Sequence, residues 1–173
     1  MVAVFSWREF NATAGDSYVN PANINLGSVN STALAPSTYP ITAGTYSFSK
    51  WIKGQWTGDF TRIENLKFWC SASGTGYVSS ESIKFSATTT SYGGTTTYAT
   101  PTTAADAQAA NVLVFSAPGT ANIGFTGVLT ASLTTSAAGS NMSDFIVLQA
   151  SIGAAATAGS TQQKTLTLSY DET

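Results

Sequence analysis

Nine acidic side chains are the main source of reactive groups in this chain, because it has no histidine and one cysteine. The absence of histidine removes Ser-His-Asp and Cys-His catalysis and the usual zinc sites. Two carboxylates could still hydrolyse a glycosidic bond. Glu64 and Glu81 lie on segments that we expect to be neighbouring strands, so these two acids could meet. We favour the alternative that they pair with Lys67 and Lys84 or are simply solvated.

Other ligands for a metal ion or a cofactor are sparse. Calcium needs several oxygen ligands on one short loop, and neither the acids and amides of residues 16–23 nor the Asp171-Glu172 pair has such a spacing. The glycines of residues 124–127 have the wrong spacing for a phosphate loop and lead into no helix. We therefore predict no catalytic residue, no metal site and no cofactor.

The single cysteine, Cys70, excludes an intrachain disulfide. It ends the apolar run 66–70, which has the character of a strand. A reactive thiol needs exposure and a nearby positive group, whereas free cysteines in apolar runs usually pack as small hydrophobes. We therefore expect Cys70 to be buried and inert.

The chain carries few charges, 9% of its residues against about 25% in an ordinary soluble domain. Acids separate the cations between residues 50 and 84, so no uninterrupted basic run exists and nucleic acid is a poor candidate partner. No stretch approaches the roughly 18 apolar residues of a membrane span. The first ten residues lack the basic and long apolar regions of a signal peptide, so we expect a chain made without export.

Aromatic residues cluster between positions 46 and 77, and the sequence leaves two roles open for them. Trp51, Trp56 and Trp69 could form an exposed aromatic surface that stacks on sugars. Trp and Tyr are also enriched in protein cores and in oligomer interfaces, and we favour this second interpretation.

Alternation of apolar and polar residues dominates the chain and predicts strands. The pattern shifts phase near Lys50-Trp51, which indicates a bulge or bend. Residues 145–148 are apolar on both faces, so we expect a central strand that is covered on both sides. The expected strands are residues 2–10, 44–56, 60–70, 82–87, 111–115, 123–133, 145–152 and 166–170.

Many short strands separated by Gly, Pro and Asn turns are typical of a β-sandwich. We predict an all-β fold, a single sandwich of jelly-roll or immunoglobulin-like type over residues 1–173, with an irregular N-terminal segment. Residues 1–43 form an arm or a long loop packed on the sandwich or on a neighbouring subunit. Residues 88–103 have the composition of an exposed hairpin, and residues 103–110 of a short helical stretch.

The order of several short motifs resembles small β-rich structural and capsid-decoration proteins of tailed bacteriophages. The resemblance covers most of the chain and consists of strand and turn patterns, so it transfers no functional residue. Its motifs are NINLGS (23–28), YPITAG (39–44), SKWIKG (49–54), IENLKFW (63–69), DFIVLQ (144–149) and TLTLSYDE (165–172).

The resemblance implies a virion structural protein, most simply a capsid decoration (cement) protein that binds the assembled shell. Its partners would be the major capsid protein or other virion proteins, and its own copies would form a homo-oligomer, with a trimer favoured. No nucleic acid and no membrane would be bound, and the virion would be assembled in the host cytoplasm. The alternative function is a carbohydrate-binding or host-recognition module of a tail or head fibre.

The N-terminal strand and the segment after it are the first candidates for the contact with the shell. The expected interface residues are Phe5, Trp7, Phe10, Ile24 and Leu26. Under this hypothesis, deleting residues 1–10 removes particle binding and leaves the sandwich folded.

Overall fold

The computed structural model of the chain describes residues 2–11, 18–72, 77, 80–89, 109, 111–134, 141–157 and 163–173. Within these ranges the chain forms eight strands and no helix. The strands are β1 (Val4–Glu9), β2 (Lys50–Thr57), β3 (Arg62–Ala72), β4 (Glu81–Thr88), β5 (Asn111–Val112), β6 (Leu133–Thr134), β7 (Phe145–Ile152) and β8 (Lys164–Glu172).

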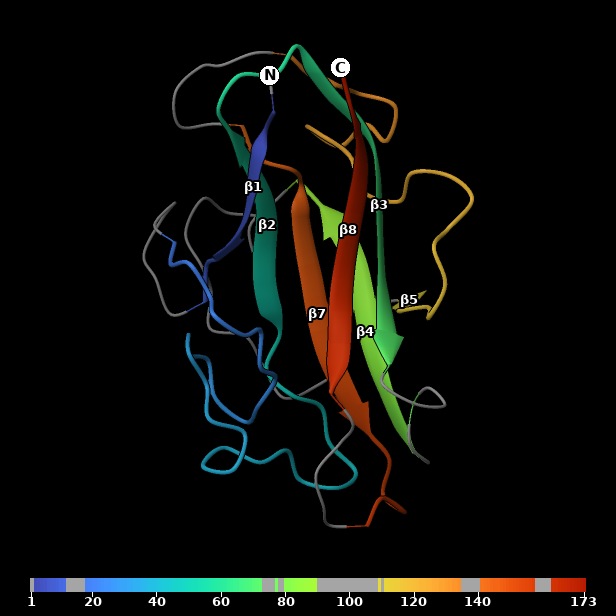
Figure 1. Cartoon of the computed structure of the whole chain (residues 1–173). Coiled ribbons are helices and arrows are strands. Elements are labelled where there is room, and N and C mark those ends of the chain that lie inside the picture. The colour runs from blue at the N-terminus through green and yellow to red at the C-terminus, as the bar shows by residue number, and fades with distance from the viewer. Residues whose placement is uncertain are drawn as a thin grey trace.

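The strands form two antiparallel sheets, which confirms the all-β prediction. One sheet has five strands in the order β1-β2-β7-β4-β5, and the other has three in the order β6-β3-β8. The smaller sheet lies over the β7 and β4 side of the larger one, while β1 lies at the opposite edge of the larger sheet (Figure 1). The main core fills the space between the sheets and includes Ile52, Trp56, Phe68, Ile146 and Leu148.

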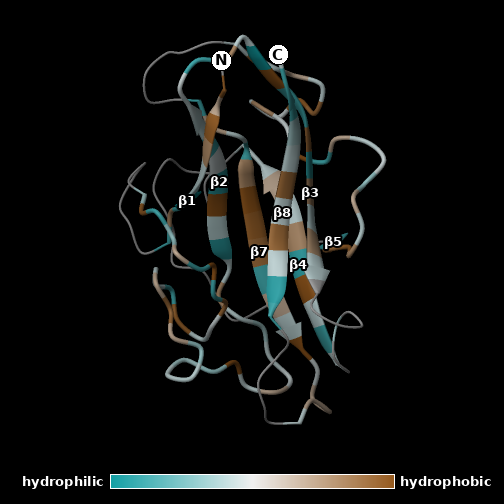
Figure 2. Cartoon of the chain, in the orientation of Figure 1, coloured by the Kyte–Doolittle hydropathy of each residue, from teal (hydrophilic) through white to brown (hydrophobic). Residues whose placement is uncertain are grey.

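Strand β7 is the central strand of the larger sheet and is covered on both faces, as the sequence predicts. Its residues from Phe145 to Leu148 are all buried, and Figure 2 shows hydrophobic colour along most of the strand. Ile146 and Leu148 belong to the core between the sheets. Phe145 and Val147 point to the other face, where they join a second cluster with Phe10, Trp51 and Ala109.

The predicted bulge before β2 is also present. Tyr46 lies opposite Ser151 of β7, whereas Lys50 lies opposite Leu148. Four residue steps from Tyr46 to Lys50 therefore correspond to three steps along β7, and such an extra residue on one strand defines a bulge. The irregular stretch between these pairs turns the side chains of Ser47 and Ser49 into the protein, where both are buried.

Two predicted strands are much shorter than expected. Within residues 123–133, Phe125 and Val128 exchange backbone hydrogen bonds around a tight turn, so the run folds back on itself. The turn residues Thr126 and Gly127 have positive φ angles of 52° and 82°, as a two-residue hairpin turn requires. The 111–115 run is strand only over β5. The predicted 88–103 hairpin and 103–110 helix fall almost entirely outside the described residues.

The segment from residue 18 to residue 43 is irregular and lies against the lower part of the sandwich in Figure 1. Ile24 and Leu26 pack against the main core as partly buried residues. Backbone hydrogen bonds from Ser28 to Tyr39 and from Phe48 to Gly27 hold the segment to itself and to the chain that enters β2. These contacts leave Ile24 and Leu26 only partly exposed.

Candidate binding surface

The N-terminal strand β1 occupies an outer edge of the five-stranded sheet, where β2 is the one described strand that pairs with it. Its alternation places Phe5 and Trp7 toward the core, where Phe5 contacts Trp56 at 5.4 Å between ring centroids and Trp7 contacts Phe68 at 6.1 Å. Val2 and Val4 point outward and are 77% and 60% exposed. The outward-facing valines, rather than the half-buried aromatic rings, are therefore the apolar groups that β1 offers to a partner.

The backbone of β1 also has an open side. Glu9 exchanges two backbone hydrogen bonds with Val19, so its N–H and C=O point away from β2. In an antiparallel ladder this direction alternates, and Phe5 and Trp7 therefore point their backbone groups the same way. No described strand pairs with β1 on that side. This set of outward groups, with Val2 and Val4, is called the β1 edge below.

Phe10, a predicted interface residue, is buried in this chain instead. It is 3% exposed, and its ring packs edge-on against Phe145 at 5.0 Å. Together with Trp51 and Val147 it covers the outer face of the larger sheet. Phe10 cannot contact a partner without leaving this cluster, so its assignment to the interface is corrected.

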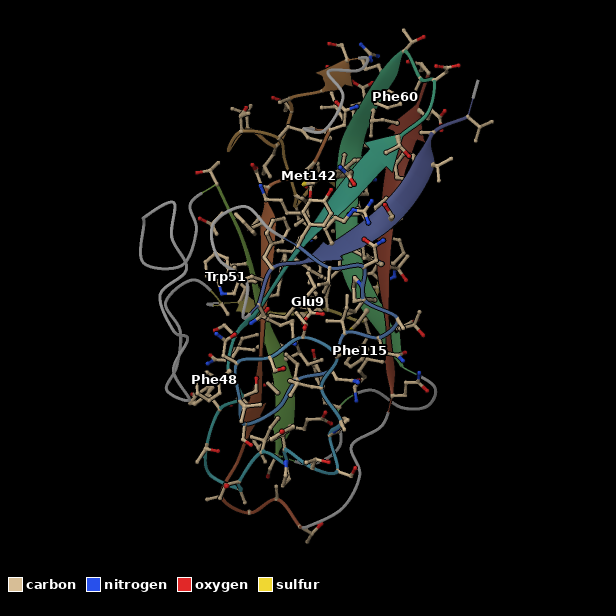
Figure 3. All side chains as sticks on the ribbon, turned by 90° about the vertical axis from the view of Figure 1, so that its left-hand side faces the viewer. Glu9, Phe48, Trp51, Phe60, Phe115 and Met142 are labelled. Carbon is tan, nitrogen blue, oxygen red and sulfur yellow. The ribbon has the colours of Figure 1, made fainter. Side chains whose placement is uncertain are left out.

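A buried ion pair fixes the end of β1. Lys50 Nζ lies 2.5 Å from Glu9 Oε1, and the two side chains are 3% and 0% exposed. The ammonium also donates to the carbonyl of Ser31 at 2.8 Å. Burial lowers the pKa of Lys50, and the Glu9 carboxylate partly opposes this shift. Figure 3 labels Glu9 near the middle of the view, and its side chain is fully buried, so it is not accessible as a reactive group.

Strand β8 has a second open edge. The Cys70 N–H bonds to Val114, and the Phe68 N–H bonds to the Asn122 side chain, so both point away from β8. Their register partners on β8, Leu166 and Leu168, therefore direct their own backbone groups away from β3. The described strands supply no neighbour on that side.

Two of the three tryptophans that we considered for an exposed aromatic surface lie in the interior, as the favoured interpretation predicts. Trp51 and Trp56 are 0% exposed, Trp51 in the outer cluster and Trp56 in the core between the sheets. Trp69 on β3 is half-buried. Alternation indicates which residues share a face, but not which face is turned inward, so the sequence left both roles open. An exposed platform of all three rings is therefore wrong, and Trp51 and Trp56 are core residues.

The two acids considered for glycoside hydrolysis lie in different sheets, so the expectation that their strands are neighbours is wrong. Glu64 on β3 pairs with Arg62 at 2.7 Å, and Glu81 on β4 pairs with Lys164 at 3.4 Å. Each acid therefore has a basic partner, although not the lysine expected from the sequence. The part of the chain that the structure describes contains no group of three or more His, Cys, Asp or Glu residues that could hold a metal ion.

Cys70 is fully buried in the core, and burial raises the pKa of its thiol. Its Sγ lies 3.5 Å from the Val114 carbonyl. The neighbouring Tyr77 donates its hydroxyl hydrogen bond to the Leu113 carbonyl at 2.8 Å, and burial raises the pKa of this phenol as well. A thiol in these surroundings is a packing group.

A cavity of about 360 Å³ lies beside the lower half of β8. Its floor comes from β4 and β7, and its sides from β8, Trp7 and the segment of residues 21–41. Aliphatic side chains and polar groups share its walls, and its charged wall residues are Glu81 and Lys164, which pair with each other. This cavity could not be predicted from the sequence, because five separate segments of the chain build its walls.

Comparison with known proteins adds no relative: no protein-family model, no curated protein and no solved structure matches the chain. Within the described ranges, no helical segment has the length and hydropathy that a membrane crossing would require.

Proposed function

We propose that the protein is a structural component of a tailed-phage virion, a decoration protein that binds the assembled shell and stabilises it. The sequence motifs resemble such proteins, and the low charge favours a surface that packs against other protein. The carbohydrate-binding alternative loses its main support, because two of its three tryptophans are core residues.

We also infer that the sandwich is a jelly roll rather than an immunoglobulin-like fold. A jelly roll is a folded-over hairpin in which the second strand pairs with the seventh, the third with the sixth and the fourth with the fifth. All three pairs occur here as β2–β7, β3–β6 and β4–β5. In an immunoglobulin sandwich the second strand would instead lie beside the fifth. Jelly rolls are common among viral capsid proteins, which agrees with the proposed function.

The observation that carries the proposal is the part of the β1 edge around Phe5 and Trp7, which no described strand covers. Soluble proteins usually guard a free strand edge with charged side chains, proline, a bulge or a covering loop. From Val2 to Trp7 this edge carries no charge and no proline, and its outward side chains Val2 and Val4 are largely exposed. An edge of this kind is suited to being covered by another protein subunit.

The proposed mechanism is adhesion between subunits of the shell. Copies of the protein, as a trimer or another homo-oligomer, would bridge neighbouring capsid subunits through their β1 edges. Burial of apolar side chains and pairing of free backbone groups would then oppose expansion and rupture of the shell.

The test is binding of a Val2→Glu, Val4→Glu double variant to purified phage particles that lack the protein. Both side chains are exposed, so the variant should fold normally, while the two carboxylates would be buried unpaired at the contact. We expect co-sedimentation with particles to fall by roughly tenfold or more.

A Val128→Glu, Leu129→Glu variant is the matched control, because these side chains are about half exposed but lie at the hairpin turn. It should co-sediment as the wild type does. Equal binding by both variants, or loss confined to the control, would rule out the β1 edge as the contact.

A further inference from the structure

The open edge of β8 and the cavity beside it form one groove. Leu166 and Leu168 direct backbone N–H and C=O groups to the side of β8 that has no described strand. The cavity begins at the same place, since Lys164, Thr165 and Leu166 belong to its wall. An extended peptide that bonded to this edge would have the cavity directly beneath its inward side chains.

The position of the groove follows from the strand order. A complete jelly roll would pair its first strand with its eighth, but β1 pairs with β2 over its whole length. β1 approaches β8 near the end of that strand, where the Ala3 N–H bonds to Glu172 Oε1 at 2.7 Å and Phe5 contacts Tyr170. Nearer the start of β8, the irregular N-terminal segment lies where a neighbouring strand would pair with β8 in a complete jelly roll. This segment makes no described backbone hydrogen bond to Leu166 or Leu168.

The walls of the cavity define the occupant chemically. Aliphatic side chains such as Ile24, Ile83 and Leu148 form half of the lining, and its uncharged polar part includes Asn25 and Gln163. The Glu81 and Lys164 side chains are 6% and 5% exposed and neutralise each other, so the site has no unbalanced charge. An occupant should therefore be uncharged and apolar on the side that faces the cavity.

We propose that this groove accepts an extended segment of a neighbouring virion protein, which adds to β8 as an extra strand and inserts alternate small apolar side chains into the cavity. This inference rests on the proposed function, because it names the chemistry of the shell partner. A compact small molecule would fill the cavity but would leave the backbone N–H and C=O of Leu168 without hydrogen-bond partners, because Leu168 lies beyond the cavity wall.

A second copy's β1 is a poorer occupant. To enter the groove, β1 would have to leave β2, which would separate Glu9 from Lys50 and leave a buried ammonium without its carboxylate. An arm that is already extended in the partner carries no such cost.

The first measurement is hydrogen exchange at the Leu166 and Leu168 amides, in the free protein and in protein bound to phage particles. Both amides face an open edge, so we expect fast exchange in the free protein and strong slowing, by roughly a hundredfold or more, once a strand is added. The Thr167 amide is the internal control, because it faces β3 and should be slow in both states.

The second measurement uses an Ala22→Trp variant, which places a large side chain at an exposed position of the cavity wall. We expect particle binding to weaken by roughly tenfold. Ala117→Trp is the control, because Ala117 is exposed and lies outside the cavity wall.

The outcomes separate the two proposals. Suppose that the wild-type protein binds particles but exchange at Leu166 and Leu168 is unchanged, or that Ala22→Trp binds as well as the wild type. Either result would overturn the strand-addition inference and leave the decoration function standing. Failure of the wild-type protein to bind particles at all would overturn the decoration function and this inference together.

Discussion

At the scale of single residues, two asparagine side chains act in place of neighbouring strands. The Asn122 amide accepts from the Phe68 N–H at 2.7 Å and donates to the Phe68 carbonyl at 2.8 Å. Asn11 does the same between the Trp51 N–H and the Ser49 carbonyl, at 2.7 Å each. A side-chain amide has one donor side and one acceptor side, as a peptide group has, so it can complete a ladder where no strand is present.

The Glu9–Lys50 pair is the residue-scale feature with the largest expected effect on stability. Removing one partner leaves a buried charge without compensation, so Lys50→Met should lower the free energy of unfolding by about 3–5 kcal/mol. Replacing both residues, as Glu9→Leu with Lys50→Met, should restore most or all of the loss, because the desolvation of both ions is then avoided. Chemical denaturation of the two single variants and the double variant measures this coupling.

The ionic interpretation of this pair would be wrong if the double variant were as unstable as the sum of the single ones. An Arg62→Met variant is a suitable control, because the Arg62–Glu64 pair is largely exposed. Its replacement should change the stability by less than about 1 kcal/mol.

At the scale of elements, β1 and β8 can approach each other over β2 because Gly54 has no side chain. A Cβ atom at this position would lie 2.8 Å from a ring carbon of Phe5 and 3.0 Å from a methyl of Leu168. Trp56 would also be in contact, at 3.1 Å. The glycine therefore makes room for side chains from both sheets.

We expect Gly54→Ala to lower the free energy of unfolding by about 1–3 kcal/mol, because the extra methyl group overpacks the core beneath β1. Gly119→Ala is the matched control, since nothing lies within 4 Å of the added atom and the change should be nearly neutral. Thermal unfolding of both variants provides the comparison. Equal melting temperatures would show that Phe5 and Leu168 can move aside freely.

The strands that could be predicted from the sequence are those with a long alternating run or a long apolar run. The 60–70 run is recovered as β3, and the 145–152 run as β7 with both faces buried. The tight turn at Thr126-Gly127 escaped notice because it lacks the Asn-Gly or Asp-Gly pair that usually marks such turns. The Asp144 carboxylate supports this turn from a distant element by accepting from the Gly127 N–H, and local sequence does not report that contact.

The candidate site could be predicted only in part, for a related reason. The N-terminal strand was expected at a surface, and the structure places β1 at an edge. Alternation alone does not say which face of the sheet is covered. The side chains that face outward in this region depend on the second cluster, in which Phe10 and Trp51 cover one face. The open edge of β8 depends on strand order, which pairs residues about a hundred positions apart, such as Phe68 and Leu168.

At the scale of the whole molecule, the N-terminal residues are part of the folded body rather than a removable arm. Deleting residues 1–10 would remove Glu9 from Lys50, Phe10 from the outer cluster and Phe5 from the core. We therefore expect the truncated chain to lose most of a typical stability of about 5–15 kcal/mol, rather than to stay folded as the sequence suggested.

Circular dichroism and thermal unfolding of the truncated chain measure this loss. A deletion of residues 1–2 is the control, because it spares β1 and the buried Ala3 and removes the exposed Val2. A truncated 1–10 variant that unfolds cooperatively at the wild-type temperature would contradict the role assigned to these residues.

The long separation between paired strands has a consequence for biosynthesis. β3 finds its main partner in β8, and β4 finds its main partner in β7, which also pairs with β2. A growing chain on the ribosome therefore carries β3 and β4 without their main partners, and β2 without one of its two neighbours, until β7 and β8 emerge. Loop closure over such distances is slow. We expect the nascent chain to depend on chaperones during this interval, because its unpaired apolar strands are exposed to aggregation.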